Sequence, residues 1–586
     1  DTDSPLFRAT VDGLVQQLRA LPEVESAVSY YDTNAPGMVS DNRRVVLAQV
    51  VIKGDSDDAD EKIDAILETV HAAASEAAGF EIAMGGQTSI AKQSKELLEE
   101  DFVRIMMVTL VLGLIILLIA FRAVVAAIIP LILAIGSIFI ATAIAGIVSQ
   151  GYPLADAYTE MILLMGMAVG IDYSLFIVSR FRSELKAGRP KLEAIAVASD
   201  TTGRAVFYAG VTVMLSLVGL MMTTNPIFIS LALGAIIVVL IALVGSMTLL
   251  PAMLGILGDN INRLRVPIIG REKPESNGGI WSVITDRVLA RPGIMATVAA
   301  SALILAALPV TSLNLGFNGG SDAFPDAVEG KRALELLEEH FTAGLAQPAF
   351  VVVDAKSVTS PDVTDAVDRL IESVSNDESF FPPFEVVSNG AGDLLYVKVP
   401  MVGEIDDELS ANAVKHLRSN IVPAAFADSD AEVYVSGASA ASMDFKDHMY
   451  SRAPYVFGFV LVLAFLLLLV MFRSIVIPVK AIALNLLSVG AAYGVLVAVF
   501  QWGWGISLLG AEATGVIEAW LPLFLFGILF GLSMDYHMLI LSRIKEAYDQ
   551  GYTNDESVSM GIKITAGQIT SAAAITPNRI RIPIAD

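Results

Sequence analysis

The sequence has no cysteine and only five histidines among its 586 residues. Without cysteine the chain can form neither a disulfide framework nor a thiolate metal site. The histidines show no paired spacing typical of metal ligands, so we expect no metal and no cofactor. The sequence also lacks a nucleophile elbow and a phosphate-binding P-loop, so we do not expect it to use ATP.

Charged residues are scarce as well, at 17% of the chain, whereas 54% of the residues are hydrophobic. Such a long and apolar chain indicates a polytopic membrane protein. The net charge of −24 is concentrated in residues 1–101 and 315–452, where acidic residues outnumber basic ones more than twofold. Acidic surfaces repel nucleic acid, so we expect no nucleic-acid partner.

Ten apolar segments are about long enough to cross the hydrocarbon core of a bilayer. They lie at residues 102–121, 123–148, 159–181, 204–223, 227–257, 293–313, 454–472, 474–500, 518–542 and 558–575. The sequence therefore predicts transmembrane helices over 102–257, a single one within 293–314 and a further group over 451–575. Residues 258–292 are predicted to be a cytoplasmic linker.

Orientation follows from the distribution of basic residues, which concentrate on the cytoplasmic side of a membrane. The connections around 180–204 and 263–291 are rich in Lys and Arg, whereas the loops 149–160, 223–226 and 501–520 contain neither. Counting spans from the basic connections places residues 1–101 and 315–450 outside the cytoplasm.

Both extracytoplasmic blocks show the mixed helix and strand patterns of small α+β domains. In the first block we expect helices at 6–21 and 57–77 and strands at 24–31, 44–52 and 80–84. In the second we expect helices at 330–341, 361–375 and 407–420 and strands at 349–354, 384–388, 394–399 and 432–436. Asp3-Ser4-Pro5 and Thr359-Ser360-Pro361 each enter a helix, and by this match the first block lacks the part that precedes Ser360 in the second.

One ionisable pair lies in the middle of the 159–181 segment, where Asp172 and Tyr173 interrupt a run otherwise apolar enough to cross a bilayer. An acid at that depth indicates function, because an isolated carboxylate in hydrocarbon must take a proton or find a partner. The pair returns 363 positions later as Asp535 and Tyr536. A Ser-Arg pair follows each motif at the same spacing, so the sequence predicts an internal duplication, which is typical of transporters.

With these motifs the chain resembles the resistance-nodulation-division (RND) superfamily, and most closely its MmpL-type (mycobacterial membrane protein large) bacterial lipid exporters. The resemblance rests on Gly-Ile-Asp172-Tyr173-Ser-Leu-Phe, Leu-Ser533-Met-Asp535-Tyr536, Thr202-Gly203-Arg204, Gly567-Gln568-Ile-Thr570-Ser571 and the repeat itself. It implies a polytopic α-helical membrane protein with two α+β extracytoplasmic porter domains and twelve spans. About ten are visible, so the family pattern implies that the first is missing, the eleventh is cut short and the twelfth is absent. We expect residues 576–586 to be an anomalous tail.

The resemblance also implies site residues. Asp172 and Tyr173 would face Asp535 and Tyr536 as a proton relay. Polar residues that could reach this relay are Ser571, Thr570, Ser533, Tyr208 and Asn485, each of which could equally serve helix packing. His537 could join the relay as well, but we expect it to face a neighbouring helix. Gly166, Gly170, Gly527 and Gly531 stand four apart in pairs, a spacing that lets helices approach closely, and we expect packing more than gating from them.

We therefore expect proton-driven export of a lipid or another hydrophobic molecule from a bacterial inner membrane, with an apolar pocket between the porter domains receiving the lipid. Membrane lipids and protons are the expected partners, and the chain is either a monomer or a trimer. Three alternatives remain: an RND-type helper of protein secretion, small-molecule efflux, and an intramembrane aspartyl protease. The Gly-x-Gly-Asp motif of such proteases is absent here, and we expect no enzyme.

Overall fold

The computed structural model describes residues 2–575 apart from 41, 55, 78, 156, 266–279, 317–323, 325–327, 342–347, 404, 406 and 510–512. The chain divides into two compact units. One combines Asp1–Phe102 with Leu315–Asp447, and the other combines Val103–Asn314 with His448–Asp586. Each half of the sequence thus contributes to both units. The predicted tail at 576–586 lies outside the described residues.

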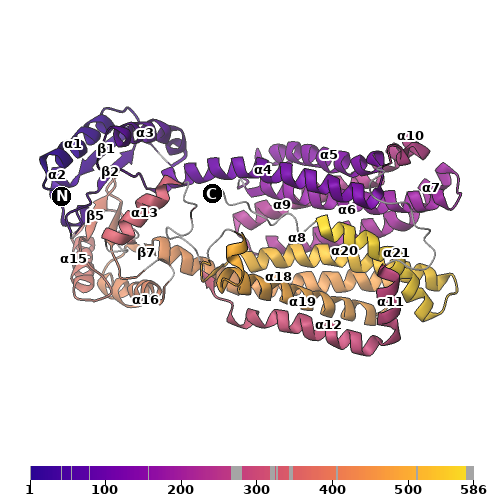
Figure 1. Ribbon diagram of the computed structural model, residues 1–586. Coiled ribbons are helices and arrows are strands. Elements are labelled where there is room, and N and C mark those ends of the chain that lie inside the picture. Colours follow the sequence, from indigo (N-terminus) through magenta and orange to yellow (C-terminus); the bar gives the residue numbers. More distant parts are fainter. Residues whose placement is uncertain are drawn as a thin grey trace. The chain divides into compact units, whose positions relative to one another are not determined.

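The second unit is a bundle of helices that run side by side (Figure 1). Among the described residues, eight helical stretches are long and apolar enough to cross a membrane. They contain α5 (Val124–Ser149), α6 (Ala157–Lys186), α8 (Arg204–Met221), α9 (Pro226–Met247), α12 (Pro292–Ala307), α18 (Ala438–Phe472), α19 (Val476–Leu496) and α20 (Leu521–Asp549). The chain is a multi-pass membrane protein.

The other two predicted spans belong to helices outside this group. The first is the end of α4 (Gln87–Phe121), in which Met106–Phe121 forms a shorter apolar stretch. The last lies in α21 (Asn554–Ile575). This unit also contains three shorter α-helices, α7 (Lys191–Ala198), α10 (Leu249–Leu257) and α11 (Ile280–Ala290).

The first unit contains both α+β blocks. The described elements of the first block are α1 (Pro5–Arg19), β1 (Val24–Ser29), α2 (Tyr30–Thr33), β2 (Ala48–Ile52) and α3 (Ser56–Glu76). Those of the second are α13 (Glu329–His340), β4 (Ala349–Asp354), α15 (Pro361–Ser375), β5 (Glu385–Ser388), β6 (Leu394–Val399), α16 (Glu408–His416), α17 (Val422–Ala425) and β7 (Glu432–Ser436). The predicted helices and strands of the second block are confirmed, with shifts of a few residues at some ends.

The second block is built on a four-stranded antiparallel sheet in the order β5-β6-β4-β7. In its register, Val351 of β4 lies opposite Val397 of β6 and Val435 of β7. Alternate residues of β4, namely Ala349, Val351 and Val353, are fully buried in the core. A strand with one buried face requires this period of two. The alternation of apolar residues in the sequence therefore predicted the position of β4.

The first block differs, because its sheet has only β1 and β2 among the described residues. Ala27 of β1 pairs with Val50 of β2, and both strands pack on α1 and α3. The predicted strand at Phe80–Met84 is wrong, since this segment forms no strand in the structure. The physical reason is that no strand within the described ranges pairs with it; the Met84 amide donates instead to Glu329 Oε1 at 3.1 Å.

Helix α13 packs on the first block although its sequence precedes β4 of the second. Glu329 lies beside His71, with Oε2 and Nε2 2.5 Å apart, and Arg332 forms an ion pair with Glu81 at 2.7 Å. A Cβ atom at Gly330 would overlap Ile90 of α4, which shows how closely the two helices approach. The first block is therefore completed by a helix that belongs to the other half of the sequence.

Candidate functional site

Asp172 and Tyr536 form a hydrogen bond between the two halves of the helical unit. Asp172 lies on α6 and has 6% of its surface exposed. The hydroxyl group of Tyr536, on α20, donates to Asp172 Oδ2 at 3.2 Å. An acid buried among apolar helices requires such a partner, because the interior offers little water to stabilise its charge.

The other two residues of the predicted relay lie on the same helices. Tyr173 is 2% exposed, and a Cβ atom added at Gly210 of α8 would stand 3.3 Å from its hydroxyl oxygen. Tyr173 therefore faces α8 while its neighbour Asp172 reaches α20. Asp535 lies within α20, but its side chain is outside the described residues.

The four glycines lie where helices approach closely. A Cβ atom at Gly166 would come within 2.5 Å of Ile138 of α5, and one at Gly170 within 2.7 Å of the Ala134 backbone. The contacts are looser on α20, where Cβ atoms at Gly527 and Gly531 would meet α8 at 3.1 and 3.3 Å. The glycines thus let α6 lie against α5 and α20 lie against α8, which fixes the positions of Asp172 and Tyr536.

The polar residues predicted to lie near the relay differ in how deeply they are buried. Tyr208 is half-buried on α8 and packs against the apolar cluster that contains Phe530 and Met534. Ser533 and His537 are half-buried on α20. Thr570 is exposed on α21, and its hydroxyl donates to the Ala566 carbonyl at 2.7 Å.

Ser571 also belongs to α21, with its side chain outside the described residues. A residue that plays a clearer part is Asn485 of α19, which is fully buried. Its Nδ2 donates to the Phe530 carbonyl at 3.2 Å and so joins α19 to α20.

A network of charged side chains, not predicted from the sequence, joins the halves further along the same two helices. Arg180 of α6 contacts Glu184 at 2.8 Å and Glu546 of α20 at 3.1 Å. Glu546 also accepts from Arg543 at 2.5 Å, and Arg543 donates to the Thr202 hydroxyl at 2.8 Å. The available signal was the duplicated Ser-Arg motif, with an acid three or four positions after each arginine, the spacing at which helical side chains meet.

Thr202 belongs to a π-helical turn, Ser199–Gly203, between α7 and α8. Such turns interrupt the regular helical hydrogen bonds and occur often at functional sites. Because Arg543 of the second half bonds to this turn and Arg180 of the first half bonds to Glu546, each half supplies an arginine to the other. The network lies about 12 Å along α6 from Asp172, given eight residues at 1.5 Å each.

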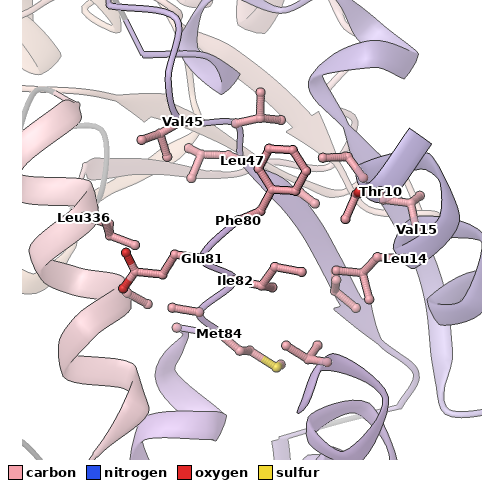
Figure 2. A pocket seen from close by; sticks show the side chains of 18 of the residues that line it. Thr10, Leu14, Val15, Val45, Leu47, Phe80, Glu81, Ile82, Met84 and Leu336 are labelled. Atoms are coloured by element: carbon pink, nitrogen blue, oxygen red, sulfur yellow. The ribbon is translucent and has the colours of Figure 1, made fainter. Parts of the chain in front are cut away.

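The first unit contains a separate cavity of about 290 Å³ (Figure 2). Its walls come from α1, from residues 45–50, from residues 80–85 and from α13. The lining is apolar except for Thr10 and Glu81, and Leu14, Leu47, Phe80 and Leu336 are among the side chains that form it. Its volume is at the lower limit of pockets that bind small molecules.

Glu81 lies at the side of this cavity that faces α13. Hydrogen bonds from Arg332 hold the pKa of the Glu81 carboxyl below its usual value, against the opposing effect of burial. The same pair raises the pKa of Arg332. The pair therefore stays charged at neutral pH and fixes α13 against residues 80–84. Across the part of the chain that the structure describes, no three His, Asp or Glu side chains form a metal site.

The fold and the site together define a duplicated multi-pass membrane protein in which acidic and phenolic side chains join two sets of membrane helices. The chain belongs to the MMPL family, whose pattern matches residues 3–295 and 322–576. The two matched segments correspond to the two halves of the repeat, and the predicted resemblance to MmpL-type RND transporters is confirmed.

Three curated relatives illustrate the similarity. The mycolic acid-containing lipids exporter MmpL11 of Mycolicibacterium smegmatis is 33% identical over 79% of this chain and 48% of its own length. MmpL11 of Mycobacterium tuberculosis H37Rv, named a heme uptake protein, is 33% identical over the same shares. The trehalose monomycolate exporter MmpL3 of M. tuberculosis CDC 1551 is 27% identical over 93% of this chain and 60% of its own. The chain spans about half the length of the MmpL11 relatives.

Proposed function

We propose that this chain takes part in proton-driven export of a lipid or a similar hydrophobic molecule across a bacterial inner membrane, with both α+β blocks outside the cytoplasm. The observation that carries the proposal is the hydrogen bond between Asp172 and Tyr536, which joins the halves of the repeat at a buried acid. Membership of the MMPL family supports transport, and the names of two relatives support a lipid cargo.

The proton acts by changing what Asp172 can bond. As a carboxylate, Asp172 only accepts hydrogen bonds, and the Tyr536 hydroxyl supplies one. Once protonated, the carboxyl group can donate and no longer carries a charge that needs stabilising in the bundle. The two states therefore favour different contacts between α6 and α20, which gives a proton the differential binding energy needed to shift a conformational equilibrium.

The charged network keeps α6 and α20 in contact at one level while this shift takes place. Arg180, Glu546 and Arg543 hold α6 and α20 together further along the two helices. Partly buried ion pairs are costly to break once formed, so movement caused by protonation is concentrated at the Asp172 level. We infer that α6 and α20 pivot about the network rather than slide past each other.

Reconstituted vesicles test the proposal directly. The protein is placed in proteoliposomes that contain a fluorescent lipid, and lipid movement is followed with and without an imposed proton gradient. Asp172→Asn and Asp535→Asn remove the titrating groups at nearly constant volume. We expect gradient-dependent movement in the unmodified protein and a loss of at least tenfold in each variant.

Asp259→Asn is the matched control, since Asp259 is an exposed aspartate of the same unit. It should transport at the unmodified rate. Equal transport by the Asn variants and the unmodified protein, or transport that ignores the gradient, would rule out the relay.

One observation favours heme as a different cargo: the M. tuberculosis relative is named a heme uptake protein. The same vesicles distinguish the two cargoes. Heme transport would appear as quenching of a lumenal heme-binding dye, with no competition by lipid. Protein secretion and small-molecule efflux would fail both assays. A protease would cleave a membrane peptide with or without a gradient, whereas we propose that the chain is not an enzyme.

A further inference from the structure

The loop at residues 501–509 presents large apolar side chains to its surroundings. It follows the membrane-spanning helix α19 and leads toward α20, and its sequence, Gln-Trp-Gly-Trp-Gly-Ile-Ser-Leu-Leu, contains no charged residue. Trp502 is 41% exposed, Trp504 66% and Leu508 90%. Large apolar side chains gathered on one exposed segment mark an interaction surface, and neither the relay nor the charged network involves this loop.

The backbone of the loop is held in place, so the outward direction of these side chains is part of the fold. Gly505 has a φ of +75°, a conformation that residues with a Cβ atom rarely adopt. The Trp504 amide donates to the Ala498 carbonyl at 2.9 Å, and the Leu508 amide donates to the Gly505 carbonyl at 3.0 Å. Ile506 is only 7% exposed. The loop thus buries Ile506 and directs Trp504 and Leu508 outward.

Gln501 fixes the base of the loop at the end of two membrane spans. Its Nε2 donates to the Ser312 carbonyl at 2.8 Å, and its Oε1 accepts from the Asn314 amide at 3.0 Å. Gln501 is the last residue of the span Val476–Gln501, and Ser312 is the last residue of the span Pro292–Ser312. The side-chain amide therefore joins two spans where both end, and the loop begins at that level.

The length of the span places that level at the membrane surface. Lys480 is exposed near the opposite end of the span, where a lysine extends its amine toward the head groups. From Lys480 to Gln501 the helix rises about 32 Å, given 21 residues at 1.5 Å each, which matches a hydrocarbon core of about 30 Å. Trp502 and Trp504 therefore lie at the level of the head groups, where tryptophan is enriched.

The two tryptophans are a feature of the second half of the repeat. Helix α5 is the counterpart of α19, because Phe121-Arg122 precedes the one as Phe472-Arg473 precedes the other. The connection after α5, at residues 150–155, contains no tryptophan and one aromatic residue, Tyr152, which is 39% exposed. The general build of the repeat therefore does not account for the loop 501–509.

We propose that the loop 501–509 is a membrane-interface anchor, with Trp504 and Leu508 inserted among the head groups and upper acyl chains of the surrounding bilayer. The bilayer is the occupant because the exposed apolar surface of α19, where Val495 is 54% exposed, runs directly into the loop. Without a charged side chain in the loop, insertion depends on burial of apolar surface and not on lipid charge. Through Gln501 the anchor holds the ends of α12 and α19 at one depth, whatever molecule the chain transports.

Quenching of tryptophan fluorescence tests the proposal on the chain of residues 1–586 in lipid nanodiscs. Trp281→Phe, Trp502→Phe and Trp520→Phe together leave Trp504 as the only tryptophan. The probes are phosphatidylcholine brominated near the head group, phosphatidylcholine brominated near the end of the acyl chain, and iodide in water. We expect the first lipid to lower Trp504 emission at least twofold and more than the second lipid, and iodide to lower it much less.

A tryptophan exposed to water is the control. Tyr434 lies on β7 of the first unit and is 59% exposed. Tyr434→Trp, in a chain whose four native tryptophans are replaced by phenylalanine, should be quenched by iodide and not by the brominated lipids. Trp504 emission that behaves like this control would overturn the proposal. Trp504 emission that no quencher lowers would overturn it as well, since protein, such as a second copy of the chain, would then cover the loop.

Two substitutions of Leu508 test what drives insertion. Leu508→Asp places a charge at the exposed end of the loop and should at least halve the quenching of Trp504 by the first lipid, because a carboxylate resists transfer out of water. Leu508→Met keeps an apolar side chain of similar volume and should leave the quenching unchanged, as should added phosphatidylglycerol or high salt. Equal quenching in the two variants, or a strong dependence on salt, would contradict insertion by apolar burial.

Discussion

Arg180 of the first half and Glu546 of the second half form a salt bridge, with Nη2 and Oε1 3.1 Å apart. Their side chains are only 17% and 31% exposed. The two residues stand 366 positions apart in the sequence, yet they lie on the helices that carry the two Asp-Tyr pairs. The salt bridge is thus a direct link between the halves that the proposed relay must move.

Removing this link should destabilise the helical unit. We expect Glu546→Ala to lower the free energy of unfolding by about 1–3 kcal/mol, because it leaves Arg180 and Arg543 without a shared carboxylate. Thermal unfolding of the purified protein measures the effect. Asp549→Ala, at an exposed position of the same helix, should change little; a similar loss there would show that the effect does not depend on the network.

Loss of the Tyr536 hydroxyl should impair transport without unfolding the protein. Tyr536→Phe removes one hydrogen bond to Asp172, and bonds to charged groups contribute about 1.5–3 kcal/mol, so the gradient-driven rate should fall roughly 10- to 100-fold. Tyr548→Phe removes a hydroxyl from an exposed tyrosine of the same helix and should transport normally. An unchanged rate for Tyr536→Phe would separate this hydrogen bond from the mechanism.

Gly170→Ala should be strongly destabilising. The new Cβ would lie 2.7 Å from the Ala134 backbone, so α5 and α6 must separate, at a cost of about 1–3 kcal/mol. Gly136→Ala is the control, since a Cβ at Gly136 of α5 meets nothing within 4 Å. It should be neutral or slightly stabilising because alanine favours helices. Unfolding midpoints of the two variants decide the question, and equal values would contradict the close approach.

The packing of α13 on the first block should weaken in acid. The carboxyl of Glu81 has its pKa lowered from 4.5 by hydrogen bonds from Arg332. A group with a lowered pKa stabilises the folded form above its unfolded pKa, and this contribution is lost as the pH falls through the lowered value. The protection factors of the α13 amides, which correct exchange rates for their intrinsic pH dependence, should therefore stay constant from neutral pH to about pH 5 and fall below pH 4.5.

Glu81→Gln should remove most of this pH dependence, since the amide cannot titrate. Glu25→Gln, at an exposed position of the first block, should leave it intact. An unchanged profile in Glu81→Gln would show that the acid response does not come from the Glu81 carboxyl.

Local pattern was enough to predict most elements and the position of the buried acid. The long apolar runs located the helices, and Asp172 stood out because a carboxylate is costly in such a run. The alternating apolar residues of β4 predicted a strand, because every second side chain of a strand points to the same face and that face is buried. Each of these inferences depends only on residues close together in the sequence.

Long-range packing could not be predicted in this way. Phe80–Met84 carries a strand pattern, but whether it forms a strand depends on a partner that its own residues do not specify. The attachment of α13 to the first block depends on Arg332 meeting Glu81, 251 positions away. The salt bridge between Arg180 and Glu546 depends likewise on the way two distant helices pack.

The attachment of α13 also sets the order in which the first block can mature during synthesis. Arg332 leaves the ribosome 251 residues after Glu81, which takes roughly 12–50 s at 5–20 residues per second. Throughout that interval the cavity wall formed by α13 is absent, and the apolar side chains that line the cavity lack this cover. The nascent chain is therefore vulnerable to aggregation and proteolysis during this interval, and a chaperone that binds the first block would be most effective then.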